Sequence, residues 1–335
     1  MSPEPRHPPC TLFRDVDGAR LCADGSAVCI GAFDGLHLGH QALVAGTVAR
    51  ARALGLPAVA VTFEPLPREF FAPADPPPRL TLARTRVELL HGLGIDLVGL
   101  LRFDAGLAAM SAEAFVRRLL VGRLGARSVR VGPGFRFGHR RAGDLALLQS
   151  MGRDLGADGF EAEAIAPVLL DGERVSSTRV RSALAAGDFA AAARLLGRPY
   201  AIAGTVVHGR RLGRSLGYPT ANLRLGGRTP PLRGIFATRV HGVGAAPMPS
   251  VSSLGTRPTV DGGELLLEAH LFDFDGDLYG RRITVEFVDK LRDEARFDDL
   301  PSLVAQMDRD AARARAVLAA APASDDLPFP QRASA

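Results

Sequence analysis

Two histidines that lie three residues apart are the strongest candidates for chemistry in this chain. His37 and His40 stand in the stretch Gly31–Gln41, between an apolar run and a helical pattern. Side chains three residues apart share one face of a helical turn, where imidazoles can stabilise negative charge that builds on a phosphate. The residues expected to contact a nucleotide here are Gly31, Phe33, Asp34, Gly35, His37 and His40.

The elements on either side of the histidines favour the same chemistry. The apolar run 27–30 predicts a buried strand, and residues 42–54 predict a helix that Gly55 ends. In open α/β sheets such a strand-to-helix turn binds phosphate, because backbone N–H groups and the helix dipole favour negative charge there. The alternative is a glycine-rich turn that contains two incidental histidines.

A second phosphate-binding candidate is the run 174–181, which reads Arg-Val-Ser-Ser-Thr-Arg-Val-Arg. Hydroxyl groups at a helix start can cap the helix and bind phosphate, and guanidinium groups suit phosphate oxygens. The alternative is an ordinary Ser/Thr cap with surface arginines. The candidate ligands are Arg174, Ser177, Thr178 and Arg181.

The glycine-rich segment 204–222 is a third candidate, and it ends in Pro-Thr-Ala-Asn. Gly209, Gly213 and Gly217 give a loop that can fold over phosphates. Thr220 and Asn222 offer neutral oxygens, which suit a Mg²⁺ ion that keeps waters and bridges ATP phosphates. The alternative is a glycine-rich hairpin loop with an Asx turn.

The alternating stretch 265–272 predicts a strand with Glu268 and His270 on one face and apolar residues on the other. A carboxylate near a metal–nucleotide loop can accept a hydroxyl proton, and the alternative is an exposed strand carboxylate. Arg292 and Glu294 form a further polar pair, for which a surface ion pair is the alternative.

The elements that position these residues change character near residue 187. Up to that point apolar runs alternate with helical patterns, which predicts a doubly wound parallel sheet whose ligands bind beyond the carboxyl ends of the strands. The predicted strands are 27–33, 57–63, 95–103, 128–132 and 160–168, and the predicted helices include 82–93, 112–124 and 145–155.

The second half predicts an antiparallel barrel or sandwich. Its strands are expected at 201–208, 235–243, 265–273 and 282–288, with a hairpin turn at Asp275-Gly276 and a closing amphipathic helix over 299–320. The predicted domains are therefore 1–187 and 188–320, followed by a disordered tail over 321–335.

Composition excludes several classes of function. Lys290 is the only lysine, so a Walker P-loop is absent. The net charge is +5, but the arginines are scattered without interleaved aromatics, which argues against nucleic acid as a partner. No apolar run approaches the roughly 20 residues that span a bilayer. Three cysteines without metal spacing and an N-terminus without a signal peptide predict a cytoplasmic protein, and homo-oligomerisation stays open.

The motifs resemble those of known enzymes. His37-x-Gly-His40 is similar to the signature of α/β nucleotidyltransferases, and 131–138 is similar to a segment of bacterial FAD synthetases that has Asp or Asn where this chain has Gly134. The segment 204–222 resembles the riboflavin kinase signature, and 253–259 resembles another kinase motif that has Asn in place of Ser253. Over residues 15–318 the chain resembles the bacterial bifunctional riboflavin kinase/FAD synthetases.

This resemblance implies a Rossmann-like nucleotidyltransferase domain followed by a riboflavin kinase-like barrel. The barrel would phosphorylate riboflavin to FMN with Mg²⁺·ATP, and the first domain would adenylylate FMN to FAD with a second ATP. It implies that Glu268 is the base and that Thr220 and Asn222 hold the metal. It also implies that His37 and His40 stabilise the reacting phosphates. The triphosphate and flavin contacts would be Arg174, Ser177, Thr178, Arg181, Arg292 and Glu294.

Three alternatives stay open at this point. Gly134 and Ser253 depart from the family pattern, which leaves room for a riboflavin kinase with a degenerate adenylyltransferase half. A non-catalytic flavin-binding protein is a second alternative, although such a protein needs neither a base nor a metal site. An RNA-binding regulator is the third, and a salt-sensitive RNA complex would support it.

Overall fold

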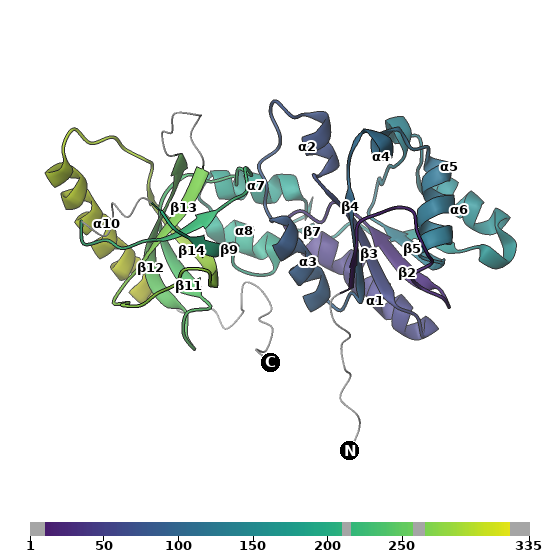
Figure 1. Ribbon diagram of the computed structural model, residues 1–335, viewed down its shortest axis with the longest axis horizontal. Coiled ribbons are helices and arrows are strands. Elements are labelled where there is room, and N and C mark those ends of the chain that lie inside the picture. The colour runs from purple at the N-terminus through teal and green to yellow at the C-terminus, as the bar shows by residue number, and fades with distance from the viewer. Residues whose placement is uncertain (1–10, 210–215, 257–264, 322–335) are drawn as a thin grey trace, which may run out of the picture. The chain divides into compact units, whose positions relative to one another are not determined.

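The computed structural model describes residues 11–209, 216–256 and 265–321 (Figure 1). Its contacts divide the chain into two units, Met1–Pro77 with Ala83–Ser176, and Pro78–Leu82 with Ser177–Ala335. Three sequence predictions lie outside the described residues: the role of Gly213, the 257–259 part of the kinase motif, and the tail beyond Ala321.

The first unit is built on a six-stranded sheet in the order β1-β4-β3-β2-β5-β6, in which every neighbouring pair is parallel. This is the doubly wound sheet that the alternating pattern predicts. Its strands are β1 (Thr11–Phe13), β2 (Ser26–Ile30), β3 (Ala58–Glu64), β4 (Leu97–Arg102), β5 (Ala126–Val131) and β6 (Glu161–Ala164).

Helices connect these strands. α1 packs against β2, β3 and β5, α3 packs against β4, and α6 packs against β6. The predicted helix 112–124 is present, but only its first turn is α-helical, and it continues as a π-helix over Val116–Arg123. The α-helices of this unit are α1 (Leu38–Leu54), α2 (Pro67–Phe71), α3 (Ala83–Gly92), α4 (Ala105–Ala109), α5 (Ala112–Phe115) and α6 (Leu145–Asp154).

The core of the first unit lies between the central strands and these helices. β2 is buried at all five positions, and the four residues after Ser26 form a continuous apolar run, as expected for a strand covered on both faces. The core is completed by aliphatic side chains of α5 and the π-helix, among them Val116, Leu119 and Leu120.

The second unit contains a closed barrel in the order β10-β13-β12-β11-β14-β9, with every pair antiparallel. The barrel alternative is therefore confirmed over the sandwich. Its strands are β9 (Ala201–Val207), β10 (Ala221–Arg224), β11 (Gly234–His241), β12 (Met248–Thr256), β13 (Leu265–Leu271) and β14 (Arg282–Arg292).

The C-terminal helix α10 (Leu300–Ala320) packs against β11, β12 and β14. Ala314 and Leu318 bury the apolar face of the helix against Ala237, Phe272 and Leu291 of the barrel. Two further helices, α7 (Ser177–Ala185) and α8 (Phe189–Leu196), pack against each other and precede β9.

One turn prediction is wrong. Asp275-Gly276 does not close a hairpin, because β13 pairs with β10 and β12 whereas β14 pairs with β9 and β11. The segment instead connects β13, which lies between β10 and β12, to β14, which lies between β11 and β9. Local turn chemistry gives the place of the reversal but not the partner strand.

Gly152 in α6 offers a test of the packing between α6 and β6. A Cβ at this position would collide with the carbonyl oxygen of Phe160, which belongs to the backbone and cannot swing away. We expect Gly152→Ala to destabilise the protein by about 1–2 kcal/mol, because overpacking outweighs the roughly 1 kcal/mol gain in helix propensity. Thermal unfolding followed by circular dichroism measures the change.

Gly46 in α1 supplies the matched control. A Cβ there would meet the guanidinium of Arg130, which is the far end of a flexible side chain paired with the half-exposed Glu163 and can shift without moving the backbone. Gly46→Ala is therefore expected to leave stability unchanged or to raise it. Equal losses in both variants would contradict this account of α6.

Candidate active sites

His37 caps the N-terminus of α1. Its Nδ1 accepts a hydrogen bond of 3.3 Å from the backbone N–H of His40, so a neutral His37 ring carries its proton on Nε2 and presents Nε2–H as a donor. The first turn of α1 contains no acidic residue. The positive end of the helix dipole is thus left for an anionic ligand.

His40 stacks on His37 with ring centroids 3.7 Å apart and an interplanar angle of 14°. Burial lowers the pKa of His40 well below its ordinary value of 6.5, and the neighbouring charges of His37, Arg86 and Arg174 lower it further. The ring is therefore neutral at physiological pH. Its Nδ1 atom is buried and has no hydrogen-bond partner among the described residues.

The turn that leads to these histidines has an unusual backbone. Phe33 and Leu36 adopt positive φ values of 50° and 42°, which is rare for bulky residues, and Gly35 between them has φ 86°. Phe33 and Leu36 are 0% and 1% exposed. Burial of two large apolar side chains offsets the backbone strain and fixes the turn that presents His37.

Arg86 is a site residue that the sequence interpretation missed. It lies on α3, its side chain is fully buried, and its guanidinium donates to the backbone oxygens of Ala32 and Phe63 and to Glu64. These bonds join the carboxyl end of β3 to the turn after β2. An arginine in the sequence of an amphipathic helix gives no signal that it points inward.

The predicted phosphate ligands of the run 174–181 fall on both sides of the division between the units. Arg174 is exposed, donates to the Pro133 carbonyl at 3.3 Å, and lies close enough to His40 to lower its pKa. α7 begins at Ser177, as predicted, and Arg181 donates to the Pro78 carbonyl at 2.6 Å. The phosphate-binding roles of Arg174, Ser177, Thr178 and Arg181 stay predictions.

Gly134 follows β5 and adopts a positive φ of 72°. A Cβ at this position would meet no atom within 4 Å. Asn and Asp are the residues other than glycine that tolerate this conformation best. The Gly134 departure from the FAD synthetase pattern therefore keeps the backbone shape and removes only a side chain.

A cluster of phenylalanines lies at the carboxyl ends of β3 and β4, and sequence reasoning missed it. Phe103 makes edge-to-face contacts at centroid distances of 5.4–5.7 Å with Phe63, Phe70 and Phe71. The ring of Phe71 is mostly in solvent, at 68% exposed. Phe70 and Phe71 come from the short helix α2, which the sequence analysis did not predict.

In the second unit, the register of β13 places Glu268 directly between Asn222 of β10 and Ser253 of β12. Leu267 and Ala269 are fully buried on the inner face of the barrel, so Glu268 lies on the outer face, as the alternation predicts. Ser253, where the family has Asn, is thus a direct neighbour of the proposed base.

Asn222 is 4% exposed, and its amide donates to the carbonyl oxygen of Thr220 at 3.1 Å. Gly209 packs against it so closely that a Cβ would lie 2.7–2.8 Å from three atoms of the Asn222 side chain. Gly209 is therefore required for the position of Asn222. Gly217 has a positive φ of 83° and leads into the segment 218–220.

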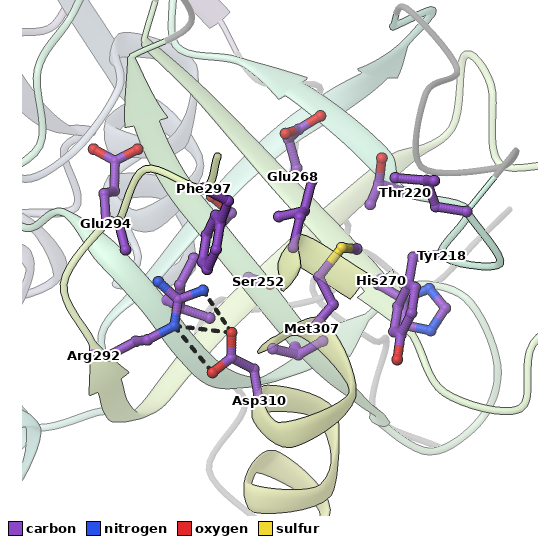
Figure 2. A pocket seen from close by; sticks show the side chains of 16 residues that line it. Tyr218, Thr220, Ser252, Glu268, His270, Arg292, Glu294, Phe297, Met307 and Asp310 are labelled. Atoms are coloured by element: carbon purple, nitrogen blue, oxygen red, sulfur yellow. Dashed lines mark hydrogen bonds and ion pairs between the residues drawn. The ribbon is translucent and has the colours of Figure 1, made fainter. Parts of the chain in front are cut away.

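A cavity of about 450 Å³ lies between the outer face of the barrel and α10. Figure 2 shows Thr220, Glu268 and Glu294 on its barrel side and Met307 and Asp310 on its helix side. The lining residues are Leu216, Tyr218, Thr220, Ile235, Val251, Ser252, Ser253, Glu268, His270, Arg292, Glu294, Ala295, Phe297, Leu303, Met307 and Asp310.

Arg292 and Glu294 both line this cavity, but they do not pair with each other. The partner of Arg292 is Asp310 of α10, which accepts from Nε at 3.0 Å and from Nη2 at 2.7 Å. The carboxylate of Glu294 instead lies against Gly255, where a Cβ would overlap it. The surface ion pair considered for Arg292 and Glu294 is therefore absent.

Both units of the chain match families of known proteins. The FAD synthetase family model matches residues 20–179, and the riboflavin kinase family model matches residues 196–318. The bifunctional riboflavin kinase/FMN adenylyltransferase of Pseudomonas fluorescens is 49% identical over 309 residues, which are 92% of this chain and 98% of that protein. The chain belongs to the bifunctional riboflavin kinase/FMN adenylyltransferase family.

Other members of this family give the same result. The Escherichia coli K12 protein of the same name is 44% identical over 292 residues, covering 87% of this chain and 92% of its own length. A crystal structure described as a macrolide-efflux protein from Streptococcus pneumoniae is 30% identical, with a TM-score of 0.72 and coverage of 91% and 98%. That description concerns the S. pneumoniae protein alone.

Both predicted activities are thus confirmed at the level of domains, since the chain contains a FAD synthetase domain and a riboflavin kinase domain. Within the part of the chain that the structure describes, every helix is too short or too polar to cross a membrane.

The burial of His40 predicts a specific pH dependence of stability. Below pH 6.5 the unfolded chain protonates this histidine while the folded chain keeps it neutral, so the folded state loses stability as the pH falls. Between pH 6.5 and 5.5 we expect the wild type to lose about 1 kcal/mol more than His40→Asn. Urea unfolding followed by circular dichroism measures the difference, and parallel pH profiles would contradict it.

Gly209→Ala is expected to slow FMN formation about 100-fold, because small displacements of positioned groups cost rate steeply and the new Cβ pushes on Asn222. FMN-to-FAD conversion should be unaffected. Gly244→Ala is the control, since its Cβ would have no neighbour closer than 4.0 Å. Initial rates of each reaction, measured separately, make the test, and equal FMN rates in both variants would refute the role of Gly209.

Proposed function

We propose that the barrel unit phosphorylates riboflavin and that Glu268 is the base. The carboxylate accepts the proton of the ribityl 5′-hydroxyl, the oxygen attacks the γ-phosphorus of ATP, and ADP leaves. The observation that carries this proposal is the register that puts Glu268 beside Asn222 at the wall of the cavity.

Thr220 and Asn222 are the proposed holders of Mg²⁺. The hydroxyl and amide oxygens are neutral and hard, which fits an ion that keeps several waters and takes other ligands from nucleotide phosphates. Among the described residues no three His, Cys, Asp or Glu side chains cluster in a metal-binding arrangement, so a neutral pair beside a nucleotide is the better fit. When bound, the ion neutralises charge on the ATP phosphates.

The parallel-sheet unit is the proposed site of the second reaction. An oxygen of the FMN phosphate attacks the α-phosphorus of ATP, and pyrophosphate leaves. This nucleophile is already ionised at neutral pH, so the step needs positioning and charge stabilisation rather than a base. The neutral His40, the Nε2–H donor of His37 and the helix terminus supply that environment, and the charge of Arg174 adds to it.

The phenylalanine cluster is the proposed contact for the flavin ring of FMN. Phe71 offers an exposed aromatic face at the carboxyl edge of the sheet, where ligands of parallel sheets bind. Aromatic rings gain about 1 kcal/mol from stacking in addition to burial. Tryptophan is absent from the chain, so phenylalanines and tyrosines must supply such contacts, and the three tyrosines all lie in the second unit, at positions 200, 218 and 279.

We further propose that the partners are small molecules only and that both reactions take place in the cytoplasm. The buried, unpaired thiols of Cys22 and Cys29 are compatible with a reducing compartment. The predicted domain limits of 1–187 and 188–320 remain proposals, as does the absence of nucleic-acid binding.

Glu268→Gln and His37→Asn test the assignment of separate sites. Glu268→Gln should reduce FMN formation by about 10²–10⁴-fold, the usual contribution of a positioned base, and leave FMN-to-FAD conversion intact. His37→Asn should do the reverse, by about 10²–10³-fold for one lost donor. Asn is also a good helix cap, so α1 keeps its N-terminal hydrogen bond.

Each variant serves as the control for the other, since both are assayed for both reactions with flavins separated by chromatography. Loss of both activities in Glu268→Gln would contradict separate sites. A His37→Asn protein that forms FAD at the wild-type rate would contradict the role of the histidine.

A further inference from the structure

Arg292 is held at the cavity by hydrogen bonds from all three of its side-chain nitrogen atoms. Its Nε and Nη2 bind the carboxylate of Asp310 at 2.7–3.0 Å, and its Nη1 donates to the Asp293 carbonyl at 2.9 Å. Asp310 is 6% exposed and also accepts from the amide of Gln306 at 2.8 Å. A planar guanidinium bound in this bidentate way cannot rotate.

The same guanidinium keeps donors for a ligand. Of its five N–H groups, one on Nη1 and one on Nη2 have no hydrogen-bond partner in the part of the chain that the structure describes. Its Cζ lies 5.8 Å from the ring centre of Phe297, which also lines the cavity (Figure 2). A fixed donor beside an aromatic ring suits a planar heteroaromatic ligand with carbonyl oxygens, which is the chemistry of the flavin ring.

The loop on the nucleotide side of the cavity is held from the same helix. The hydroxyl of Tyr218 donates to Asp308 of α10. Burial and the nearby carboxylate of Asp308 raise the pKa of Tyr218 to about 12, so the hydroxyl remains a donor at all physiological pH values. The next residue, Pro219, binds Nδ1 of His270 through its carbonyl at 2.9 Å, and Thr220 follows directly.

The position of α10, which carries Asp308 and Asp310, is fixed at both of its ends. Asp299 caps its N-terminus, and Ala314 and Leu318 anchor its C-terminal half in the apolar contact with the barrel. Asp308 and Asp310 lie between these anchors, on the stretch of the helix that borders the cavity. The sequence pattern of this helix predicts only its amphipathic character.

We propose that α10 positions both ends of the kinase cavity, with Asp310 holding Arg292 toward the flavin ring and Asp308 holding Tyr218, and through it Thr220, toward the nucleotide. This inference rests on the proposed kinase function of the cavity. Asp308 and Asp310 are positioning residues, because each acts through the side chain that it binds.

The test compares the KM for riboflavin with the KM for ATP in each variant, both measured on the full chain from initial rates of FMN formation. Asp310→Asn should raise the KM for riboflavin about tenfold, the effect of weakening a hydrogen bond between charged groups, and leave the KM for ATP within twofold. Asp308→Asn should raise the KM for ATP a few-fold, since its bond is exposed, and leave the KM for riboflavin unchanged.

Asp273→Asn is the matched control. It breaks the exposed bidentate pair of Asp273 with Arg315, which also joins α10 to the barrel unit but does not line the cavity. Neither KM should change. Arg292→Lys and Tyr218→Phe serve if an Asn variant fails to fold, because they leave Asp310 and Asp308 in place and change the side chain that each carboxylate binds. Arg292→Lys should raise the KM for riboflavin, and Tyr218→Phe should raise the KM for ATP.

Equal rises of both KM values in the Asp310 and Asp308 variants, or no rise in either, would overturn the proposal. A change of both constants in Asp273→Asn would do the same, since it would mean that any loosening of α10 has this effect. A wild-type chain that forms no FMN would instead overturn the kinase assignment itself, so the two failures are distinguishable.

Discussion

The pairing of β13 with β10 on one side and β12 on the other is the constraint on which the kinase site depends. Leu267 and Ala269 must point into the barrel, so Glu268 must point out of it, toward the cavity beneath α10. A slip of one residue would bury the carboxylate and expose the apolar set. The barrel is closed and has no free edge at which such a slip could be accommodated. The packing inside the barrel therefore fixes the position of Glu268 on its outer face.

The two units solve different chemical problems, and their residues differ accordingly. A hydroxyl nucleophile needs a base, and the barrel presents a carboxylate beside a neutral oxygen pair. A phosphate nucleophile needs no base, and the parallel-sheet unit presents a neutral His40, a capping His37 and the positive end of α1. The buried Arg86 donates hydrogen bonds to the backbone oxygens of Ala32 and Phe63 at this edge of the sheet. Its charge also lowers the pKa of His40 and so helps to keep that ring neutral.

Residues that follow from local pattern were predictable from the sequence. The five predicted strands of the first unit, the outward face of Glu268 and the helix over 299–320 all follow from periodicity. What failed depended on long-range pairing or on burial. The turn at Asp275-Gly276 gives no information about which strand β14 joins. The strands β1 and β10 are short, and β12 has small or polar residues at most of its positions, so none of the three shows a clear alternating pattern. Arg86 and Asp310 look like surface charges in the sequence. Only the fold shows that both side chains are buried, Arg86 beside Glu64 and Asp310 beside Arg292.

The central claim is that one chain carries out two different phosphorus chemistries in sequence, and labelled ATP tests it directly. The full chain would be incubated with riboflavin, Mg²⁺ and ATP labelled at either the γ- or the α-phosphorus, and the flavins would be separated over time. We expect the γ-label to enter FMN first and then FAD, whereas the α-label should enter FAD only. An α-label in FMN, or γ-labelled FMN that accumulates without FAD, would contradict it.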